Sequence, residues 1–432
     1  SELTSFSRRP TTRKAMKKSQ LKKELTLRQL VADDVEEFNE LLRYAFQVTE
    51  KDLLTFGWNN AAIKQSKYPV LKNAYVLGWF NKDKLVSQIA LYPMQINIYN
   101  SIFEMGGITG VATYPEYSGI GLMADLMKEI LSTMRKNKQS ISCLYPYSIP
   151  YYRSRGWEIV SDKMTFSMKD HQTPKVPKVD GIIQRVDCDN KDLIALHDEF
   201  AKQTHGCLIR NKLAWDEYWR WDVDDEVIAI YYDSNDKPTG YIVYLLENDV
   251  FKIKELVYLN EEAHYGIWGY INAHQSMFDK VKGANYSNHN LAFLLEDGHI
   301  KETTQPYIMA RIVDVMQFLS QYPFDSINMN VMLCFIVSDP LLEWNNKQFI
   351  VQFSPNVKQV KVIEREANSS LEDLGDSIYT LHINIQTLTT MLMGYKRPLY
   401  LRQINRLDAD DITIDILEEI IPEGKAYFSD YF

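Results

Sequence analysis

Residues 110–123 are the part of the sequence whose residue types and spacing point most directly to chemistry. They read Gly-Val-Ala-Thr-Tyr-Pro-Glu-Tyr-Ser-Gly-Ile-Gly-Leu-Met, which predicts the end of a strand, a glycine loop and the start of a helix. Small residues let backbone N–H groups approach an anion, and a helix N-terminus adds partial positive charge. The segment therefore predicts a pyrophosphate cradle, with an ordinary strand-to-helix turn as the alternative. Neither a Rossmann G-x-G-x-x-G fingerprint nor a P-loop is present.

The loop must be positioned by an α+β unit, which we expect over residues 25–173. Alternating apolar and polar residues predict strands, and apolar residues at helical spacing predict helices. The expected strands are 25–30, 75–80, 85–92, 94–99, 103–113 and 140–144, and the expected helices are 35–45, 122–136 and 151–155.

This order of elements partly recurs about 155 residues later, which suggests a structural repeat over residues 174–304. Its expected strands are 181–186, 226–232, 241–246 and 251–259, its helices are 190–202 and 263–280, and Pro-Lys-Val-Pro-Lys at 174–178 is the linker. Here the last strand is followed by Asn-Glu-Glu-Ala-His instead of a glycine loop. Because acidic side chains repel a pyrophosphate, we expect only the first copy to bind the anion.

A third α+β unit is expected over residues 305–432, and it carries no catalytic signature of its own. A strand-like stretch at 308–317 leads into a short helix ending at 322, the further strands are 328–337, 348–353, 359–364 and 378–385, and the later helices are 386–393 and 408–420. Residues 1–24 hold eight basic and two acidic residues. We interpret them as a basic leader, a solvated arm or helix.

Composition excludes several functional classes. The net charge of −9, and of −15 outside the leader, argues against a nucleic-acid partner and favours a cationic substrate, although it also serves solubility. The four cysteines form no C-x-x-C pair, and His205 with Cys207 lacks a second ligand pair, so we expect no disulfide scaffold and no metal. No apolar run spans a bilayer and no signal peptide is evident, so we expect a cytoplasmic protein without a membrane partner.

The glycine loop and a second motif together resemble the acetyl-CoA site of the GCN5-related N-acetyltransferases (GNAT). The second motif, Tyr152-Arg-Ser-Arg-Gly156-Trp157, matches the superfamily signature Tyr-x-x-x-Gly-aromatic. Residues 144–157, 306–314 and 429–432 narrow the resemblance to the Eis (enhanced intracellular survival) family, over about residues 25–432. The resemblance implies a mixed α+β protein with two tandem GNAT-like domains, whose sheets are mostly antiparallel, and a C-terminal domain similar to sterol carrier proteins.

The resemblance also implies acetyl-CoA as cosubstrate and assigns the residues that contact it. These are Val111, Ala112 and Thr113 of the strand, Ser118, Gly119, Ile120, Gly121, Leu122, Met123 and Ala124 of the loop and helix start, and Tyr147 and Ser148. Ser118, Ile120 and Met123 replace the basic residue, the arginine and the small residue usual in the family. Backbone donors remain, but charge-assisted contacts to phosphate are lost.

Proton transfer is assigned by the same resemblance. Tyr152 matches the family's general acid, since a phenol with a pKa near 10 suits protonation of a thiolate; a packing aromatic is the alternative, and its neighbour Tyr151 is expected to pack inward. The base is inferred to be the C-terminal carboxylate of Phe432, with Tyr431 and Phe432 as a buried aromatic anchor. A frayed terminus is the alternative.

The resulting hypothesis is an N-acetyltransferase acting on a primary amine of a cationic small molecule, similar to an aminoglycoside or a polyamine, or on a lysine side chain. Phe46, Phe56 and Trp58 are candidates for the acceptor pocket. The resemblance further implies a homo-oligomer, a hexamer. The alternative hypothesis is a non-catalytic, degenerate acetyltransferase that binds a ligand, a lipid or a partner.

Overall fold

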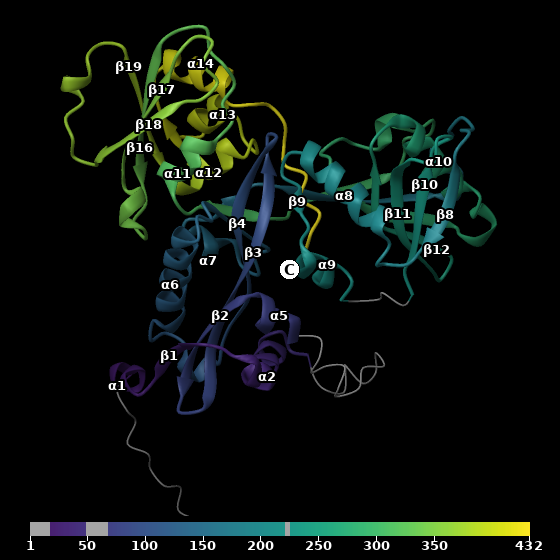
Figure 1. Cartoon of the computed structure of the whole chain (residues 1–432), viewed down its shortest axis with the longest axis horizontal. Helices are drawn as coiled ribbons and strands as arrows, with labels where there is room; N and C mark the ends of the chain where they lie inside the picture. Colours follow the sequence, from purple (N-terminus) through teal and green to yellow (C-terminus); the bar gives the residue numbers. More distant parts are fainter. Residues whose placement is uncertain (1–17, 49–67, 221–224) are drawn as a thin grey trace, which may run out of the picture. The chain divides into compact units, whose positions relative to one another are not determined.

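The computed structural model describes residues 18–48, 68–220 and 225–432 (Figure 1). Backbone contacts divide the chain into two units. Unit 1 comprises residues 1–91 and 110–130, and unit 2 comprises residues 92–109 and 131–432. The expected basic leader lies largely outside the described residues; of it, the structure shows helix α1 (Lys18–Lys23).

Unit 1 contains the first strands and helices of the chain. Its elements are α1, β1 (Thr26–Gln29), α2 (Val35–Ala45), α5 (Tyr68–Asn73), β2 (Tyr75–Asn81), the start of β3 (Lys84–Ile98), the end of β4 (Ser101–Thr113) and the start of α6 (Leu122–Lys136). β1 pairs with β2 and β2 with β3, both antiparallel. Helix α2 buries Phe38 and Leu41 on one face, as its apolar spacing predicts.

Strand β3 corrects one expectation. The two predicted strands 85–92 and 94–99 form one continuous strand that runs through Pro93. Proline lacks an N–H group to donate to a neighbouring strand. The pairing of β3 with β2 ends at Leu91, and its pairing with β9 (Leu208–Ile209) begins at Gln95. Pro93 therefore lies in a gap between two partner strands, where this edge of β3 needs no donor.

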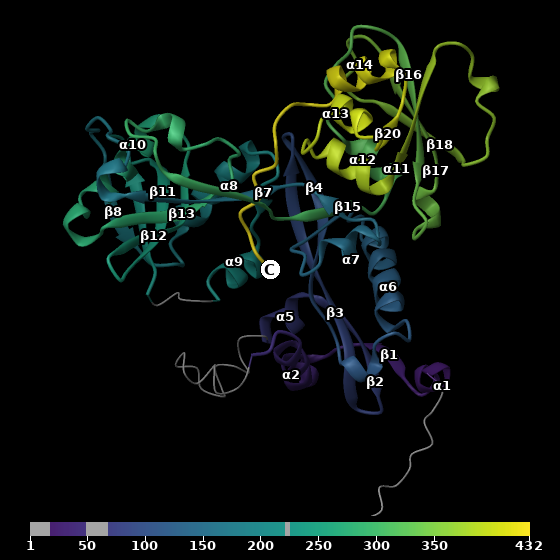
Figure 2. The same ribbon diagram turned by 180° about the vertical axis from the view of Figure 1, so that it is seen from behind.

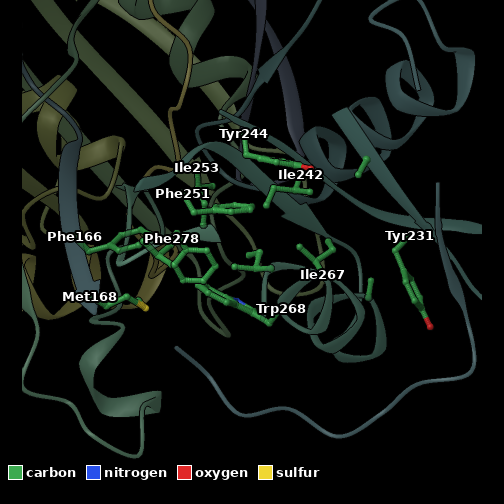
Figure 3. Packing of buried hydrophobic residues seen from close by; sticks show 14 residues of the cluster. Phe166, Met168, Tyr231, Ile242, Tyr244, Phe251, Ile253, Ile267, Trp268 and Phe278 are labelled. Atoms are coloured by element: carbon green, nitrogen blue, oxygen red, sulfur yellow. The ribbon is translucent and has the colours of Figure 1, made fainter. Parts of the chain in front are cut away.

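The strands of the expected second domain form a sheet with a helix on each face. The order is β14 (Lys301–Pro306), β7 (Asp162–Lys169), β13 (Lys280–Asn285), β12 (Val250–Tyr258), β11 (Pro238–Glu247), β10 (Val227–Tyr232) and β8 (Ile182–Val186). On β11, Ile242 and Tyr244 join the core cluster that contains residues of α10 (Glu261–Asn272), which Figure 3 shows. The alternate residues Tyr241 and Val243 join the cluster that contains residues of α8 (Lys191–Gln203). Period-two alternation thus directs the strand toward both helices.

The predicted repeat is present as a repeated order of elements. Strand β12, helix α10 and strand β13 follow one another, and the two strands pair in parallel. In the first copy β4 precedes helix α6, and β4 pairs in parallel with β5 (Ile141–Leu144), which follows that helix. The expected helix 263–280 was too long, because the chain leaves the helix at Asn272 and pairs with two strands from Lys280 onward. Helix α9 (Lys212–Tyr218) was not expected.

Three strands join sheets on the far side of the expected domain boundaries, and one of them is β9, from the expected range 174–304, which pairs with β3. β7, from the expected range 25–173, pairs with β13 and β14. β15 (Met309–Ile312), from the expected range 305–432, pairs with β5 and with β6 (Glu158–Ile159). The predicted domain limits therefore remain predictions; they are 25–173, 174–304 and 305–432. The observed sheets include strands from both sides of these limits.

The last part of unit 2 is a mixed sheet with helices (green to yellow in Figures 1 and 2). Its strand order is β18 (Lys361–Glu366), β17 (Lys347–Phe353), β16 (Val331–Ser338), β19 (Ile378–Asn384) and β20 (Leu407–Asp408), with β16 and β19 parallel. The helices are α11 (Val315–Gln321), α12 (Ile385–Leu392), α13 (Pro398–Gln403) and α14 (Asp411–Ile420). After α14, residues 421–432 form no helix or strand, and we call them the C-terminal tail.

Candidate active site

The glycine loop of unit 1 has the backbone shape that the sequence predicts. Strand β4 ends at Thr113, and α6 begins at Leu122. Between them, Gly119 has φ +78° and Gly121 has φ +85°. This left-handed region favours glycine, because a Cβ atom there clashes with the backbone. Both glycines are thus needed for the turn that leads into α6, whose first amides have no partner inside the helix.

The side chains of this loop supply no charge. The hydroxyl of Ser118 donates a hydrogen bond of 2.7 Å to the carbonyl of Pro115. Ile120 packs against a small apolar cluster that includes Val86 and Leu122. Met123 is half-buried and Ala124 is exposed. An anion bound at this loop would therefore rely on backbone N–H groups rather than on the loop's own side chains.

A lysine outside the loop approaches it. Nζ of Lys22, on α1, lies 2.5 Å from a carboxylate oxygen of Asp125 in the first turn of α6. A Cβ atom built on Gly121 would lie 3.5 Å from the same Nζ. Sequence reasoning missed this residue, because it treated the basic leader as solvated and no local pattern connects Lys22 with a loop about 100 residues later.

The strand residues predicted to bind the cosubstrate are partly accessible. Val111 and Thr113 are half-buried, while Ala112 is buried. The Thr113 hydroxyl lies 2.6 Å from the hydroxyl of the fully buried Ser87 on β3. This hydrogen bond fixes the side chain of Thr113 at the end of β4.

Tyr152 lies in a cluster of aromatic rings in unit 2. It is the buried residue of helix α7 (Ile149–Arg153), 2% exposed, and its ring centroid lies 5.0 Å from that of Tyr151 and 6.0 Å from that of Trp157. Burial raises the pKa of Tyr152 well above its usual value, so the phenol stays protonated at neutral pH. The expectation that Tyr151 packs inward was wrong. Tyr151 is half-buried under the guanidinium of Arg155, which lies 3.7 Å from its ring centroid.

Tyr147 and Ser148 precede the same helix. The Tyr147 ring is 60% exposed and lies 5.5 Å from the ring of Tyr152. Burial raises the pKa of Tyr147 to about 12. The Ser148 hydroxyl accepts a hydrogen bond of 3.3 Å from the amide of Tyr151 and caps α7. Of the two residues, Tyr147 is therefore the more available to a ligand.

The chain end is packed rather than frayed. A Cβ atom built on Gly107 would lie 2.9 Å from the ring of Phe432, whose centroid is 5.9 Å from that of Tyr92. The expected aromatic anchor was partly wrong, since Tyr431 is 60% exposed. Within the last seven residues of the tail, Ala426, Phe428 and Asp430 are buried. Both views place the C-terminus beside helix α9 (Figures 1 and 2).

Helix α9 contributes a charged group close to this end of the chain. The hydroxyl of Tyr92 donates a hydrogen bond of 2.7 Å to Oε1 of Glu217. The guanidinium of Arg220 binds the same oxygen. The carboxylate of Glu217 is therefore compensated by a cation and is 7% exposed. Sequence reasoning missed it because α9 itself was not expected.

The second copy of the fold differs at the helix that corresponds to α6. The side chain of Asn260 accepts a hydrogen bond of 2.9 Å from the amide of Ala263, so the N-terminus of α10 is capped by the chain itself. Glu261 and Glu262 occupy the first turn. At the N-terminus of α10, one amide is therefore already hydrogen-bonded, and two carboxylates add negative charge. Both features oppose the binding of a phosphate.

His205, which is close to Cys207 in the sequence, has a protein partner at each ring nitrogen. The Nδ1 atom of His205 accepts from the amide of Tyr99 at 3.1 Å, and Nε2 lies 2.8 Å from the carbonyl of Met393. Burial lowers the pKa of His205 to about 4. Over the described part of the chain, no group of three or more His, Cys, Asp or Glu residues is arranged to hold a metal ion.

Two further expectations concern the aromatic residues of the acceptor pocket and membrane-spanning segments. Phe46 is 57% exposed at the end of α2, whereas Phe56 and Trp58 lie outside the described residues. Among the helices that the structure describes, none is both long and apolar enough to cross a bilayer.

Three family models match successive parts of the chain. Residues 26–160 and residues 206–312 each match a model described as an acetyltransferase (GNAT) domain, and residues 315–429 match a sterol carrier protein domain. A search of curated proteins found no match.

Solved structures similar to the chain cover 94% of it. A conserved protein of unknown function from Enterococcus faecalis, described as a probable N-acyltransferase, is 26% identical, with 100% of its chain covered and a TM-score of 0.83. A GCN5-related N-acetyltransferase from Anabaena variabilis is 21% identical, with 100% covered and a TM-score of 0.80. Eis1 from Mycobacterium abscessus is 16% identical, with 100% covered and a TM-score of 0.75.

These comparisons confirm the predicted fold class, a mixed α+β chain with tandem GNAT domains and a C-terminal domain similar to sterol carrier proteins. They also indicate the enzyme class, N-acetyltransferase, and acetyl-CoA is the cosubstrate that GNAT domains use.

Proposed function

We propose that the protein transfers the acetyl group of acetyl-CoA to a primary amine of a cationic small molecule, similar to an aminoglycoside or a polyamine, or to a lysine side chain. The observation that carries this proposal is the turn at Gly119 and Gly121, both at positive φ, directly before α6 within a matched GNAT domain. The similarity to Eis1 supports the further proposal that the chain is a member of the Eis family.

The residues of the loop fit a pyrophosphate through their backbone. The loop is exposed at Gly119 and Gly121, and the amides of the first turn of α6 have no partner inside that helix. We propose that residues 118–124 bind the pyrophosphate and that Val111, Ala112 and Thr113 hold the thioester end of the cosubstrate. Tyr147 and Ser148 are proposed as further contacts, although the Ser148 hydroxyl already caps α7.

Tyr152 is the proposed general acid. Acetyl-CoA supplies the acetyl group as a thioester, so the amine nitrogen must bond to the carbonyl carbon while the carbon–sulfur bond breaks. Tyr152 would give its hydroxyl proton to the departing sulfur. A general acid must carry its proton before the step, and the raised pKa of Tyr152 meets this one requirement.

The C-terminal carboxylate of Phe432 is the proposed base. It would accept the proton that the attacking amine loses as the amide forms. The packing of Phe432 against Gly107 and Tyr92 supports this role, because a positioned terminus can act as a base where a frayed one cannot. The negative net charge of the chain supports a cationic acceptor.

The test is the release of free thiol from acetyl-CoA with a panel of polyamines, aminoglycosides and lysyl peptides. We expect Tyr152→Phe to lower kcat by about 10²-fold or more, since general acid–base catalysis contributes about 10²–10⁴-fold. Tyr258→Phe, a partly exposed tyrosine of β12, is the matched control and should keep the wild-type rate. Extension of the chain by two glycines beyond Phe432 moves the carboxylate and should lower kcat as well.

A single observation favours the alternative of a non-catalytic binding protein. The hydroxyl of Ser118 donates to the carbonyl of Pro115, and Ile120 packs against apolar residues. Neither side chain therefore offers a cation to a phosphate. Absence of acetyl transfer with every amine, together with an acetyl-CoA affinity in the millimolar range or weaker, would reject the enzyme and favour this alternative. Cytoplasmic location and a homo-oligomeric, hexameric state remain proposals from the family resemblance, and light scattering of the purified protein tests the oligomer.

A further inference from the structure

The C-terminal tail is held along its length although it forms no helix or strand. The hydroxyl of Tyr99 donates a hydrogen bond of 2.7 Å to the carbonyl of Gly424. The amide of Tyr427 donates one of 2.8 Å to the carbonyl of His205. Phe428 is 2% exposed. Irregular segments normally lie on the surface with their backbone groups solvated, so specific contacts must fix this one.

A buried charge cluster provides the contact closest to the chain end. Nε of Arg210 donates to Oδ1 of Asp430 at 2.9 Å, while the two terminal nitrogens donate to the two oxygens of Glu255 on β12 at 3.1 and 2.6 Å. The side chains of Arg210, Glu255 and Asp430 are 0%, 3% and 5% exposed. The guanidinium also lies 4.2 Å from the ring centroid of Tyr218 on α9. One tail carboxylate is thus bound to the second GNAT domain in the protein interior.

The cluster contains one cation and two carboxylates, and the pKa values of the two carboxylates shift in opposite directions. Burial acts to raise the pKa of Glu255, but Arg210, His197 and Tyr241 together lower it to about 2. Burial raises the pKa of Asp430, which receives one nitrogen of Arg210. Its Oδ2 has no hydrogen-bond partner among the described residues. Asp430 is therefore the partner that can be neutralised without leaving Arg210 unpaired.

A second contact fixes the backbone at the same residue. The hydroxyl of the buried Tyr307 donates a hydrogen bond of 2.8 Å to the carbonyl of Asp430. Tyr431 and Phe432 come next in the sequence. Two extended residues reach about 7 Å, so the terminal carboxylate cannot move far from a fixed Asp430.

We propose that Asp430 is a positioning residue, whose ion pair with Arg210 of the second GNAT domain holds the chain end so that the carboxylate of Phe432 serves as the base. The inference rests on the proposed function and extends it. The second GNAT domain carries Glu261 and Glu262 where the first copy has its glycine loop. The inference gives this domain a part in the reaction, which is to position the base. Buried ion pairs are weak evidence for stability, and fixing one arrangement is the better attested use.

The first experiment replaces Asp430 by asparagine. Asp430→Asn keeps the shape of the side chain and leaves Arg210 paired with Glu255, so the fold is retained. We expect kcat to fall about tenfold or more while KM for acetyl-CoA changes less than about twofold, because the cosubstrate residues are unaltered. The matched control is Ser429→Ala, which alters the adjacent residue and should leave kcat unchanged. Tyr307→Phe removes only the hydrogen bond to the Asp430 carbonyl and should give a smaller fall in kcat.

A double-mutant cycle separates positioning from a general structural effect. The second change is the extension by two glycines beyond Phe432, which displaces the carboxylate itself. If Asp430 acts through that carboxylate, Asp430→Asn causes no further fall in kcat in the extended protein. If the two effects on kcat multiply, Asp430 acts by another route and the inference is wrong.

Digestion with carboxypeptidase gives a readout independent of activity. We expect release of Phe432 to be at least about tenfold faster from Asp430→Asn than from the wild type and from Ser429→Ala, because local opening exposes the chain end. Equal release rates would overturn the inference. An active wild type whose kcat is unaffected by Asp430→Asn rejects only this inference. A wild type that is inactive with every amine rejects the proposed function, and the inference with it.

Discussion

Gly156, the glycine of the Tyr-x-x-x-Gly-aromatic motif, should tolerate no side chain. The reason is its contact with strand β15, which comes from a distant part of the sequence. A Cβ atom built on Gly156 would lie 2.6 Å from Cζ and 2.8 Å from Nε of Arg311 on β15. The residue has φ +101°, a conformation that L side chains rarely adopt. The substitution Gly156→Ala therefore combines backbone strain with a collision.

Arg311 has no room to retreat. Its side chain is 0% exposed, and its two terminal nitrogens donate to the carboxylate of Asp339 at 2.9 and 2.7 Å. Backbone strain of this kind costs about 1–3 kcal/mol. Separating a buried ion pair costs about 3–5 kcal/mol more, because a charge is left unpaired inside the protein. We expect Gly156→Ala to lower the free energy of unfolding by about 4–8 kcal/mol where the pair separates, and by less where Arg311 shifts without leaving Asp339.

The assay is urea unfolding followed by tryptophan fluorescence and circular dichroism. Gly375→Ala is the matched control, since Gly375 has φ +77° and nothing within 4 Å of the added Cβ. It isolates backbone strain and should cost about 1–3 kcal/mol. Gly269→Ala, in helix α10 with open space around it, should be neutral or stabilising. A loss for Gly156→Ala no larger than that for Gly375→Ala would refute the argument from Arg311.

Three further outcomes are expected. Lys22→Gln should raise KM for acetyl-CoA about fivefold at low salt, which corresponds to about 1 kcal/mol. The control Lys23→Gln, at an exposed lysine, should leave KM unchanged. Equal KM values for the two variants would exclude Lys22 from phosphate binding. Burial opposes the charged form of Glu255, but Arg210, His197 and Tyr241 together hold its folded-state pKa at about 2, below the usual 4.5. Glu255 therefore adds stability above pH 4.5 that is lost as the pH falls toward 2. Unfolding of Glu255→Gln should therefore depend less on pH over this window, and an unchanged pH dependence would contradict the assignment. Gly206→Ala, at φ +83° against Ala426 of the tail, should loosen the tail and speed release of Phe432 by carboxypeptidase, and an unchanged rate would argue against tight packing there.

The glycine loop could be predicted because its signals are local. The positive φ values of Gly119 and Gly121 and the start of α6 at Leu122 all follow from residues within one short segment. The same holds for α2, whose inward face carries Phe38 and Leu41 at helical spacing. Short-range sterics and apolar periodicity decide these elements, and both are visible in the sequence.

Contacts between distant segments could not be predicted in the same way. Strand β13 was not expected: the expected helix 263–280 reached its first residue, and only its pairing with β12 and β7 makes this segment a strand. The pair Arg210 and Asp430 is separated by 220 residues. Nothing near either residue indicates that it is buried with an ion-pair partner, since Arg and Asp are mostly exposed in proteins.

Among the described residues, two arginines have fully buried side chains, and each contacts a residue close in sequence to one of the two groups proposed for proton transfer. Arg311 lies against Gly156, four residues after Tyr152, and Arg210 binds Asp430, two residues before the terminal carboxylate. Replacing such buried pairs by apolar residues is often neutral or stabilising, so stability alone does not explain them. A guanidinium bound by two carboxylate oxygens, however, fixes direction as well as distance, which an apolar contact does not. Arg311 is held in this way by Asp339 and Arg210 by Glu255, so each presents a fixed guanidinium, the first to Gly156 and the second to Asp430. We therefore attribute both arginines to geometry, since the two groups proposed for proton transfer would have to be oriented to work.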